Sequence, residues 1–228
     1  MANYLDATLH FGGDAYRFFA GYSTGVVTIS DGEPHEDTIY IEPTPLSKFQ
    51  ELASRKVDFT RVDAVIPVTD VDDQFWAFSG YQFTYISARG TGTLYAALPI
   101  DVCKCLKEAG FHHVDAFIPI PGHAHHFWVF SGRKWARVEF PDMHPDYSKL
   151  HGEVRDFEEW GELYSKTTWA RIDAVLPVPD QQPHQFWVFH GNEWVRIILG
   201  DDPNDPSRTK VRNGPSSVEK GWKTLASF

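Results

Sequence analysis

Histidine and aspartate side chains are concentrated in three short segments of the chain, at positions 67–73, 119–126 and 177–184. Imidazole nitrogens can bind a transition metal or ligate haem iron, and carboxylates can hold a polyamine. The candidate ligand-binding residues in these segments are His123, His125, His126, His184, Asp70, Asp72, Asp73 and Asp180. The alternative is a solvated loop surface without a ligand, because three histidines on a flexible loop do not define a tetrahedral metal site.

Residues for covalent catalysis are not arranged recognisably in the sequence. No serine is identifiable at a strained nucleophile elbow, and neither Cys103 nor Cys105 has a positional reason to be activated. Carboxylates are plentiful, but no two of them can be paired in space from the sequence. The sequence therefore favours a binding protein over an enzyme.

Four copies of one pattern run along the chain and must position these segments. Each copy begins with an Asp-Ala pair, at 6, 63, 115 and 173, and in the last three copies the apolar stretch that follows ends at a proline. An aromatic segment and a glycine come next, as at positions 127–132. The spacing of roughly 50 to 60 residues is that of a propeller blade.

Each copy predicts a short antiparallel meander followed by a short helix. Proline ends the first strand, aromatic and β-branched residues form the second, and glycine supplies the turn to the third. Apolar residues at helical spacing predict the helices, as for Val154, Phe157, Trp160 and Tyr164. The last helix carries Val218, Trp222 and Leu225 behind a capping box formed by Ser216 and Glu219.

The predicted fold is all-β, a single four-bladed β-propeller over residues 1–228. Its blades are expected at about 4–56, 57–110, 111–166 and 167–228. Parallel βαβ units are the alternative, but the turns between strands are too short for a crossover. Closing four blades into a ring removes the exposed sheet edges of a linear array. The paired aromatics Phe75-Trp76, Phe127-Trp128 and Phe186-Trp187 are expected to pack between blades.

Four repeats of Asp-Ala, aromatic-x-Phe-x-Gly and aromatic-x-Arg-apolar, each followed by a helix, resemble hemopexin repeats. The style is similar to that of the single-domain seed albumins of pea and grass pea and their fungal and bacterial relatives. This resemblance implies a calcium or sodium ion in the central channel, held by backbone carbonyls, with chloride as a possible companion. It assigns the carbonyls to Asp6, Asp63, Asp115 and Asp173, with Ala7, Ala64, Ala116 and Ala174 as the next ring. The alternative is that the aspartate side chains cap loops at the blade entrances and that any ion is structural.

The resemblance implies a non-enzymatic protein that binds a small cationic or metallated ligand, either a polyamine such as spermine or haem. A homodimer is possible on the same grounds. The alternative is a lectin-like or protein-interaction module that uses one rim of the propeller. Fold alone does not decide between these functions.

Composition argues against several other classes of protein. The net charge is −10 and no run of Lys or Arg forms a basic stripe, so nucleic acid is not an expected partner. No window approaches 18 uninterrupted apolar residues, so no membrane helix is expected. Cys103 and Cys105 are expected to point to different sides of a helix without bridging. With no recognisable secretory signal, the interpretation is a reduced, cytoplasmic protein. Its ring is expected to close by packing of Tyr4 and Leu5 on the last blade and through the helix around Trp222.

Overall fold

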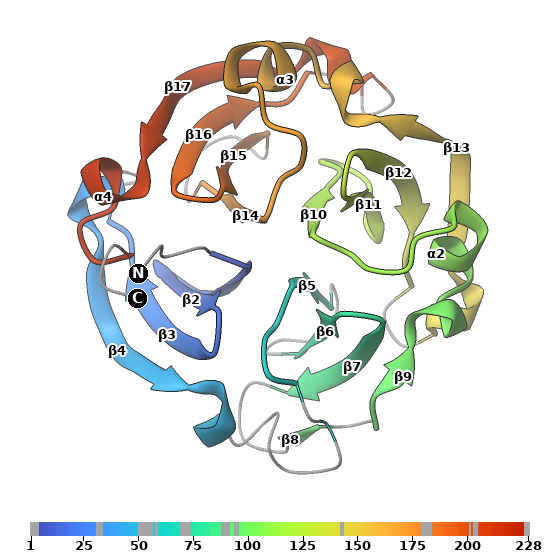
Figure 1. The fold of residues 1–228 in the computed structure, drawn as a ribbon, viewed down its shortest axis with the longest axis horizontal. Helices are drawn as coiled ribbons and strands as arrows, with labels where there is room; N and C mark the ends of the chain where they lie inside the picture. Colours follow the sequence, from blue (N-terminus) through green and yellow to red (C-terminus); the bar gives the residue numbers. More distant parts are fainter. Residues whose placement is uncertain are drawn as a thin grey trace.

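The computed structural model describes residues 5–30, 34–49, 57, 59–68, 74–87, 92–93, 96–141, 144–178, 184–200, 202 and 205–225. Four antiparallel sheets surround a central axis as the blades of a β-propeller (Figure 1). The predicted four-bladed fold is therefore confirmed.

Each blade is formed by one continuous stretch of chain, and its strands follow one another from the axis outward in sequence order, except that β8 and β9 of blade 2 both pair with β7. Blade 1 contains β1 (Ala7–Gly12), β2 (Ala15–Ala20), β3 (Ser23–Thr28) and β4 (Thr38–Pro45). Blade 2 contains β5 (Ala64–Pro67), β6 (Gln74–Ser79), β7 (Gln82–Ser87), β8 (Gly92–Thr93) and β9 (Leu98–Pro99). Blade 3 contains β10 (Ala116–Pro119), β11 (His126–Ser131), β12 (Lys134–Glu139) and β13 (Lys149–Asp156). Blade 4 contains β14 (Ala174–Pro177), β15 (Gln185–His190), β16 (Glu193–Ile198) and β17 (Lys210–Ser217).

Short helices lie at the periphery of the ring (Figure 1). Those that follow the outer strands are η2 (Leu46–Lys48), η3 (Ile100–Val102), α2 (Lys104–Ala109), η5 (Phe157–Glu159), α3 (Gly161–Thr167) and α4 (Val218–Gly221). Three further 3-10 turns precede the outer strands, namely η1 (Pro34–Glu36), η4 (Pro145–Tyr147) and η6 (Pro206–Arg208). None of the described helices is long and apolar enough to cross a membrane.

Two details of the helix predictions are wrong because the outer strands run further than the sequence pattern indicates. Strand β13 continues to Asp156, so Val154 belongs to the strand and not to the helix that follows it. Strand β17 continues to Ser217, which becomes the N-cap of α4 without a side-chain hydrogen bond. The capping box of Ser216 and Glu219 is therefore not formed.

The paired aromatics pack between blades, as predicted. Successive residues of a strand point to opposite faces of its sheet. Phe75 therefore packs with residues of blade 1, whereas Trp76 packs with residues of blade 3, 6.0 Å from the ring of Phe140 between centroids. Phe127 and Trp128 divide in the same way between blades 2 and 4. Each interface is thus filled from both sides by side chains of one sequence motif.

The interface between blades 1 and 4 closes the ring without a disulfide. The buried cluster there combines Leu5 and Phe18 of the first blade with Trp187 and Trp222 of the last. The ring centroids of Phe18 and Trp222 are 6.2 Å apart, and those of Trp187 and Trp222 are 5.1 Å apart. The predicted closure through Leu5 and Trp222 is confirmed, whereas Tyr4 lies outside the described residues.

The two cysteines differ from the prediction. Cys103 has extended backbone angles and precedes α2 as its N-cap, so the two residues do not share a helical turn. Their sulfur atoms consequently lie 3.4 Å apart, both buried and both free.

Candidate functional site

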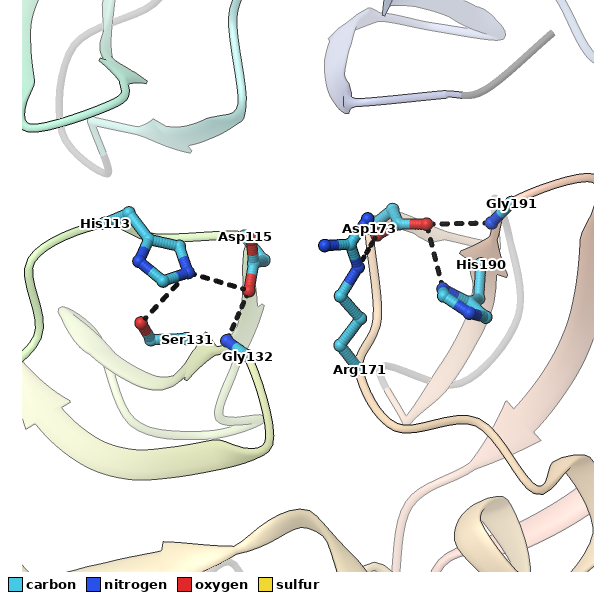
Figure 2. Close-up of polar contacts among 8 residues, drawn as sticks. All are labelled: His113, Asp115, Ser131, Gly132, Arg171, Asp173, His190 and Gly191. Atoms are coloured by element: carbon cyan, nitrogen blue, oxygen red, sulfur yellow. Dashed lines mark hydrogen bonds and ion pairs between the residues drawn. The ribbon is translucent and has the colours of Figure 1, made fainter. Parts of the chain in front are cut away.

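Four aspartates begin the innermost strands and make the same contacts in every blade. The backbone N–H groups of Asp6, Asp63, Asp115 and Asp173 donate to the carbonyls of Phe19, Phe78, Phe130 and Phe189 at 2.8–2.9 Å. The Oδ2 atoms accept hydrogen bonds of 2.5–2.8 Å from the backbone N–H groups of Gly21, Gly80, Gly132 and Gly191. Figure 2 shows this contact in blades 3 and 4. Each carboxylate therefore caps the hairpin turn of its own blade, which fixes the four acids at one end of the channel.

A polar cavity of about 250 Å³ opens at this end of the channel, and we call it the channel mouth. Its lining consists of charged side chains, Asp6, Arg61, Asp63, Asp115, Arg171 and Asp173. The two arginines are paired with the aspartates of their own blades, Arg61 with Asp63 at 2.5 Å and Arg171 with Asp173 at 2.8 Å. Carboxylates outnumber guanidinium groups, so the mouth is an acidic site.

The arginines lie in opposite blades, 2 and 4 (Figure 1). In blade 3 the corresponding position is His113, whose Nε2 is 3.6 Å from the Oδ2 of Asp115 (Figure 2). Sequence reasoning missed the two arginines, although Arg-x-Asp-Ala recurs in the second and fourth copies of the repeat.

The carboxylates of Asp6, Asp115 and Asp173 differ in the direction in which their pKa is shifted. Burial raises the pKa of Asp6 to about 6 and also raises the pKa of Asp115. Burial acts in the same direction on Asp173, but hydrogen bonds from His190 and Gly191, with the nearby Arg171, hold its pKa below the ordinary value. For Asp6 and Asp115, the effect of burial on the pKa therefore exceeds that of the nearby Arg61, His113 and Arg171.

A much smaller cavity, about 10 Å³, lies further along the channel. It is lined by residues of all four innermost strands, Asp6, Ala7, Thr8, Ala64, Val65, Asp115, Ala116, Phe117, Asp173, Ala174 and Val175. Such a volume holds about one water-sized particle. The innermost strands have a sheet neighbour on one side only, so alternate backbone carbonyls and amides face the channel. The residues predicted to surround the channel are thus brought together, with Asp63 at the mouth and the others reaching the inner cavity.

The predicted histidines lie at the opposite end of the blades. The loop that carries His123 and His125 joins β10 to β11, whereas the turn capped by Asp115 joins β11 to β12 at the other end of β11. The imidazole rings of His123 and His126 are 5.7 Å apart, and His125 adopts a left-handed backbone conformation with φ 62°. His184 precedes β15 in blade 4. Asp70, Asp72, Asp73 and Asp180 lie outside the described residues.

One predicted histidine joins a cluster that the sequence did not indicate. His126 lies close to Glu139 and His151, which belong to the next two strands of blade 3. These three residues come together only through strand pairing, so no linear motif marks them.

Sequence reasoning also missed that residues 21–25 have the Gly-x-Ser-x-Gly spacing of a nucleophile elbow, with Ser23 at its centre. The elbow requires a turn from a strand into a helix. Ser23 instead begins β3 after the hairpin turn of blade 1, and its neighbour Thr24 donates to the carbonyl of Phe18 at 2.9 Å. The segment is structural.

The fold is that of the four-bladed propellers found in plant seed albumins and hemopexin-fold proteins. A 2S albumin seed protein from Dolichos superposes with a TM-score of 0.82 at 20% identity, covering 99% of both chains. The hemopexin-fold protein CP4 from cow pea has a TM-score of 0.82 at 21% identity, covering 100% of this chain and 99% of that one. A plant lectin with two metal binding sites from Cicer arietinum has a TM-score of 0.81 at 14% identity, covering 99% and 98%. No family model and no curated protein matches the chain.

Proposed function

We propose that this protein is a non-enzymatic binding protein whose channel mouth binds a small organic polycation, with spermine as the representative ligand. The observation that supports this proposal is the lining of the mouth, where four carboxylates face two guanidinium groups. Protonated amines are attracted to an excess of carboxylates in a partly enclosed polar cavity. Among the similar solved structures, three are described as seed or plant albumins and one as a plant lectin.

A metal ion in the inner cavity is part of the same proposal. The hard backbone oxygens of the innermost strands suit calcium or sodium, and the cavity is large enough for one such ion. Asp6, Asp115 and Asp173, with Ala7, Ala64, Ala116 and Ala174, line this cavity and their carbonyls would hold the ion, whereas Asp63 lies at the mouth. Native mass spectrometry of the purified chain before and after chelation tests this part, with one calcium ion per chain as the expected result.

Spermine is favoured over haem as the ligand of the mouth because of the lining. All six residues that form it are charged in their ordinary states. A porphyrin needs apolar contacts, which this cavity does not offer. A hemin titration monitored by the Soret band is the direct comparison, and a shifted band with no heat from spermine would reverse the preference.

Isothermal titration of the full chain with spermine tests the proposal through two substitutions of opposite sign. Asp115→Asn keeps an acceptor for the N–H of Gly132 but removes a negative charge, so it is expected to weaken binding roughly tenfold, equivalent to about 1.4 kcal/mol. Arg171→Gln removes a positive charge from the mouth and is expected to strengthen binding by a similar factor. Arg155→Gln is the control, because Arg155 pairs with Glu159 at the outer edge of blade 3. No heat from spermine, or the same direction of change for both variants, would contradict the proposal.

A lectin-like function is the second candidate, and one observation favours it. Tyr22 and Tyr81 occupy equivalent hairpin turns in neighbouring blades, where their carbonyls accept hydrogen bonds from Leu46 and Ile100 at 2.7 and 2.8 Å. Both side chains are about three-quarters exposed, 73% and 76%. Exposed tyrosine rings offer an apolar face and a hydroxyl group for a sugar.

A glycan array tests this second candidate. The double variant Tyr22→Ser and Tyr81→Ser should lose binding, and Tyr147→Ser, which alters an exposed tyrosine after the third strand of blade 3, should keep it. Binding that is unchanged in the double variant excludes this rim.

A further inference from the structure

Three adjacent strands of blade 3 bring two imidazoles and a carboxylate together. His126 begins β11, Glu139 ends β12 and His151 lies in β13, the outermost strand (Figure 1). His126 is paired with Glu139, and His151 is paired with Arg137, two residues before Glu139 on the same strand. Residues two apart on a strand share a face of the sheet, so the three side chains project from one face.

The distances within this cluster suit a metal ion. One ligand atom from each residue lies within 4.8 Å of the other two. The Nε2 of His151 is 3.3 Å from the Oε2 of Glu139, and the rings of His126 and His151 are 5.0 Å apart. Zinc bonds of about 2.0–2.1 Å in a tetrahedral shell place neighbouring ligand atoms about 3.3 Å apart. One pair is therefore already at the spacing of a metal shell, and His126 offers a third ligand atom within 4.8 Å of both.

Comparison between blades shows that the fold does not require this cluster. In blade 4, Gln185 occupies the position of His126 and accepts a hydrogen bond of 3.0 Å from Arg196. In blade 2, Gln74 accepts a hydrogen bond from Tyr85 at the equivalent place. In blades 2 and 4, a glutamine that accepts one hydrogen bond is thus sufficient at this position of the strand. In blade 3 an imidazole replaces it, and the buried Nδ1 of His126 has no hydrogen-bond partner within the described part of the chain.

We propose that His126, Glu139 and His151 form a binding site for one divalent transition-metal ion, with zinc as the representative. Two histidines and one carboxylate are a recognised zinc ligand set that leaves a position for water or another ligand. The side chains of Glu139 and His151 are 29% and 37% exposed, so the ion enters directly from solvent. The site lies at the opposite end of β11 from the channel mouth and is independent of the function proposed for it.

Two positively charged side chains lie near this site and disfavour the binding of a metal cation, which provides a test of the proposal. The Nζ of Lys149 is 3.1 Å from the Oε2 of Glu139, and Arg137 shares the face of the cluster. The Lys149 side chain is largely exposed, so its ammonium group can turn into solvent when the metal binds. Replacing Lys149 by methionine should therefore strengthen metal binding by about threefold or more.

Titration of the chelator-treated full chain with zinc chloride, with calcium chloride as the comparison, tests the proposal. The expected result is one zinc site that discriminates against calcium, weakened by roughly tenfold or more in His126→Ala and His151→Ala. His112→Ala is the matched control, since His112 is an exposed histidine outside the cluster. Melting temperatures of the metal-free variants establish that each one is folded.

Cobalt(II) distinguishes this site from the two cysteines, which are also potential ligands. A bound cobalt ion should show ligand-field bands without the thiolate charge-transfer band that coordination by Cys103 or Cys105 would produce. A thiolate band, or zinc binding that is unchanged in His126→Ala and His151→Ala, overturns the proposal. Asp115→Asn at the channel mouth should leave zinc affinity unchanged, so this result does not depend on spermine binding.

Discussion

The carboxylate of Asp37 in blade 1 accepts a hydrogen bond of 3.0 Å from the backbone N–H of Thr224, near the C-terminal end of the described chain. Asp37 also accepts from the hydroxyl of Thr224 and from the N–H of Leu225, and it is almost completely buried. The corresponding residue of blade 3 is Ser148, which accepts from the N–H of Cys105 at 3.0 Å. In both cases the side chain of the residue after a 3-10 turn accepts a hydrogen bond from the helical segment at the end of the preceding blade. The ring is thus closed by a contact of the same kind as that between blades 2 and 3, in which Asp37 accepts three different hydrogen bonds.

Replacing Asp37 by alanine should destabilise the closed ring. The substitution leaves the buried N–H of Leu225 and the partly buried N–H and hydroxyl of Thr224 without the Asp37 acceptor, and we expect a loss of about 2–4 kcal/mol in the free energy of unfolding. Urea denaturation followed by tryptophan fluorescence measures it, with Asp146→Ala in the exposed turn η4 as the control. A loss as small as that of the control would show that packing at Trp222 closes the ring alone.

Gly161 is the position where an added methyl group should be tolerated least. It begins α3 with φ 52°, and a Cβ atom there would lie 2.1 Å from the carbonyl oxygen of Ser207 in blade 4. Gly161→Ala should therefore cost about 3 kcal/mol, from the left-handed backbone and the clash together. Gly122→Ala is the matched control, because Gly122 has φ 75° and no described atom within 4 Å of the added carbon, so only about 1 kcal/mol is expected. Equal costs in urea denaturation would contradict the close approach of blades 3 and 4.

Glu162 should make the interface between blades 3 and 4 sensitive to acid. Hydrogen bonds from Lys166 and from the backbone N–H of Val211 lower the pKa of Glu162 to about 2. A lowered pKa means that the stabilisation is present above the unfolded value of 4.5 and is lost as the pH falls toward 2. The difference in melting temperature between the wild type and Glu162→Gln should therefore be full at pH 6 and vanish near pH 2. A difference that does not change with pH would assign the effect to packing.

Spermine binding at the channel mouth should weaken as the pH falls from 7 to 5. Because the pKa of Asp6 is raised to about 6, its carboxyl is mostly ionised at pH 7 and mostly neutral at pH 5, while the amines of spermine stay protonated. Titrations at the two pH values measure the change in affinity. In Asp6→Asn, which still has an acceptor for the N–H of Gly21, the profile should be flatter. A wild-type affinity that is unchanged between the two pH values would show that Asp6 takes no part in binding.

The sequence predicts the fold well because the relevant signals are local and repeated. Each Asp-Ala pair begins an innermost strand, and each Phe-Trp pair necessarily faces two different interfaces, since neighbouring residues in a strand alternate. Helix boundaries are harder to predict, because Val154 has apolar helical spacing yet belongs to a strand. The pairing of β12 with β13 extends that strand, and this pairing is a tertiary contact.

The two candidate sites differ in the same way, because one is marked by the local repeat and the other depends on tertiary contacts. The acids of the channel mouth are recognisable because they belong to the repeat, whereas the cluster at His126 depends on the registers of two strand pairs. The pairing of β12 with β13 includes a shift between Trp135 and Arg137. Without that shift, His151 would not lie opposite Arg137 and would be displaced from Glu139. The sequence singles out loop histidines such as His123. The proposed metal ligands instead include Glu139 and His151, strand residues whose proximity to His126 no sequence spacing predicts.

The alternation of arginines around the channel has a consequence for the shape of the field that a ligand meets. With Arg61 and Arg171 in opposite blades, the mouth carries an electrostatic quadrupole, negative along the diagonal from Asp6 to Asp115 and largely neutralised along the other. A spherical ion is indifferent to such a pattern. A linear molecule with a positive charge at each end has one preferred orientation about the channel axis, along the diagonal from Asp6 to Asp115. The charge pattern at the channel mouth therefore has twofold symmetry, although the blades repeat four times.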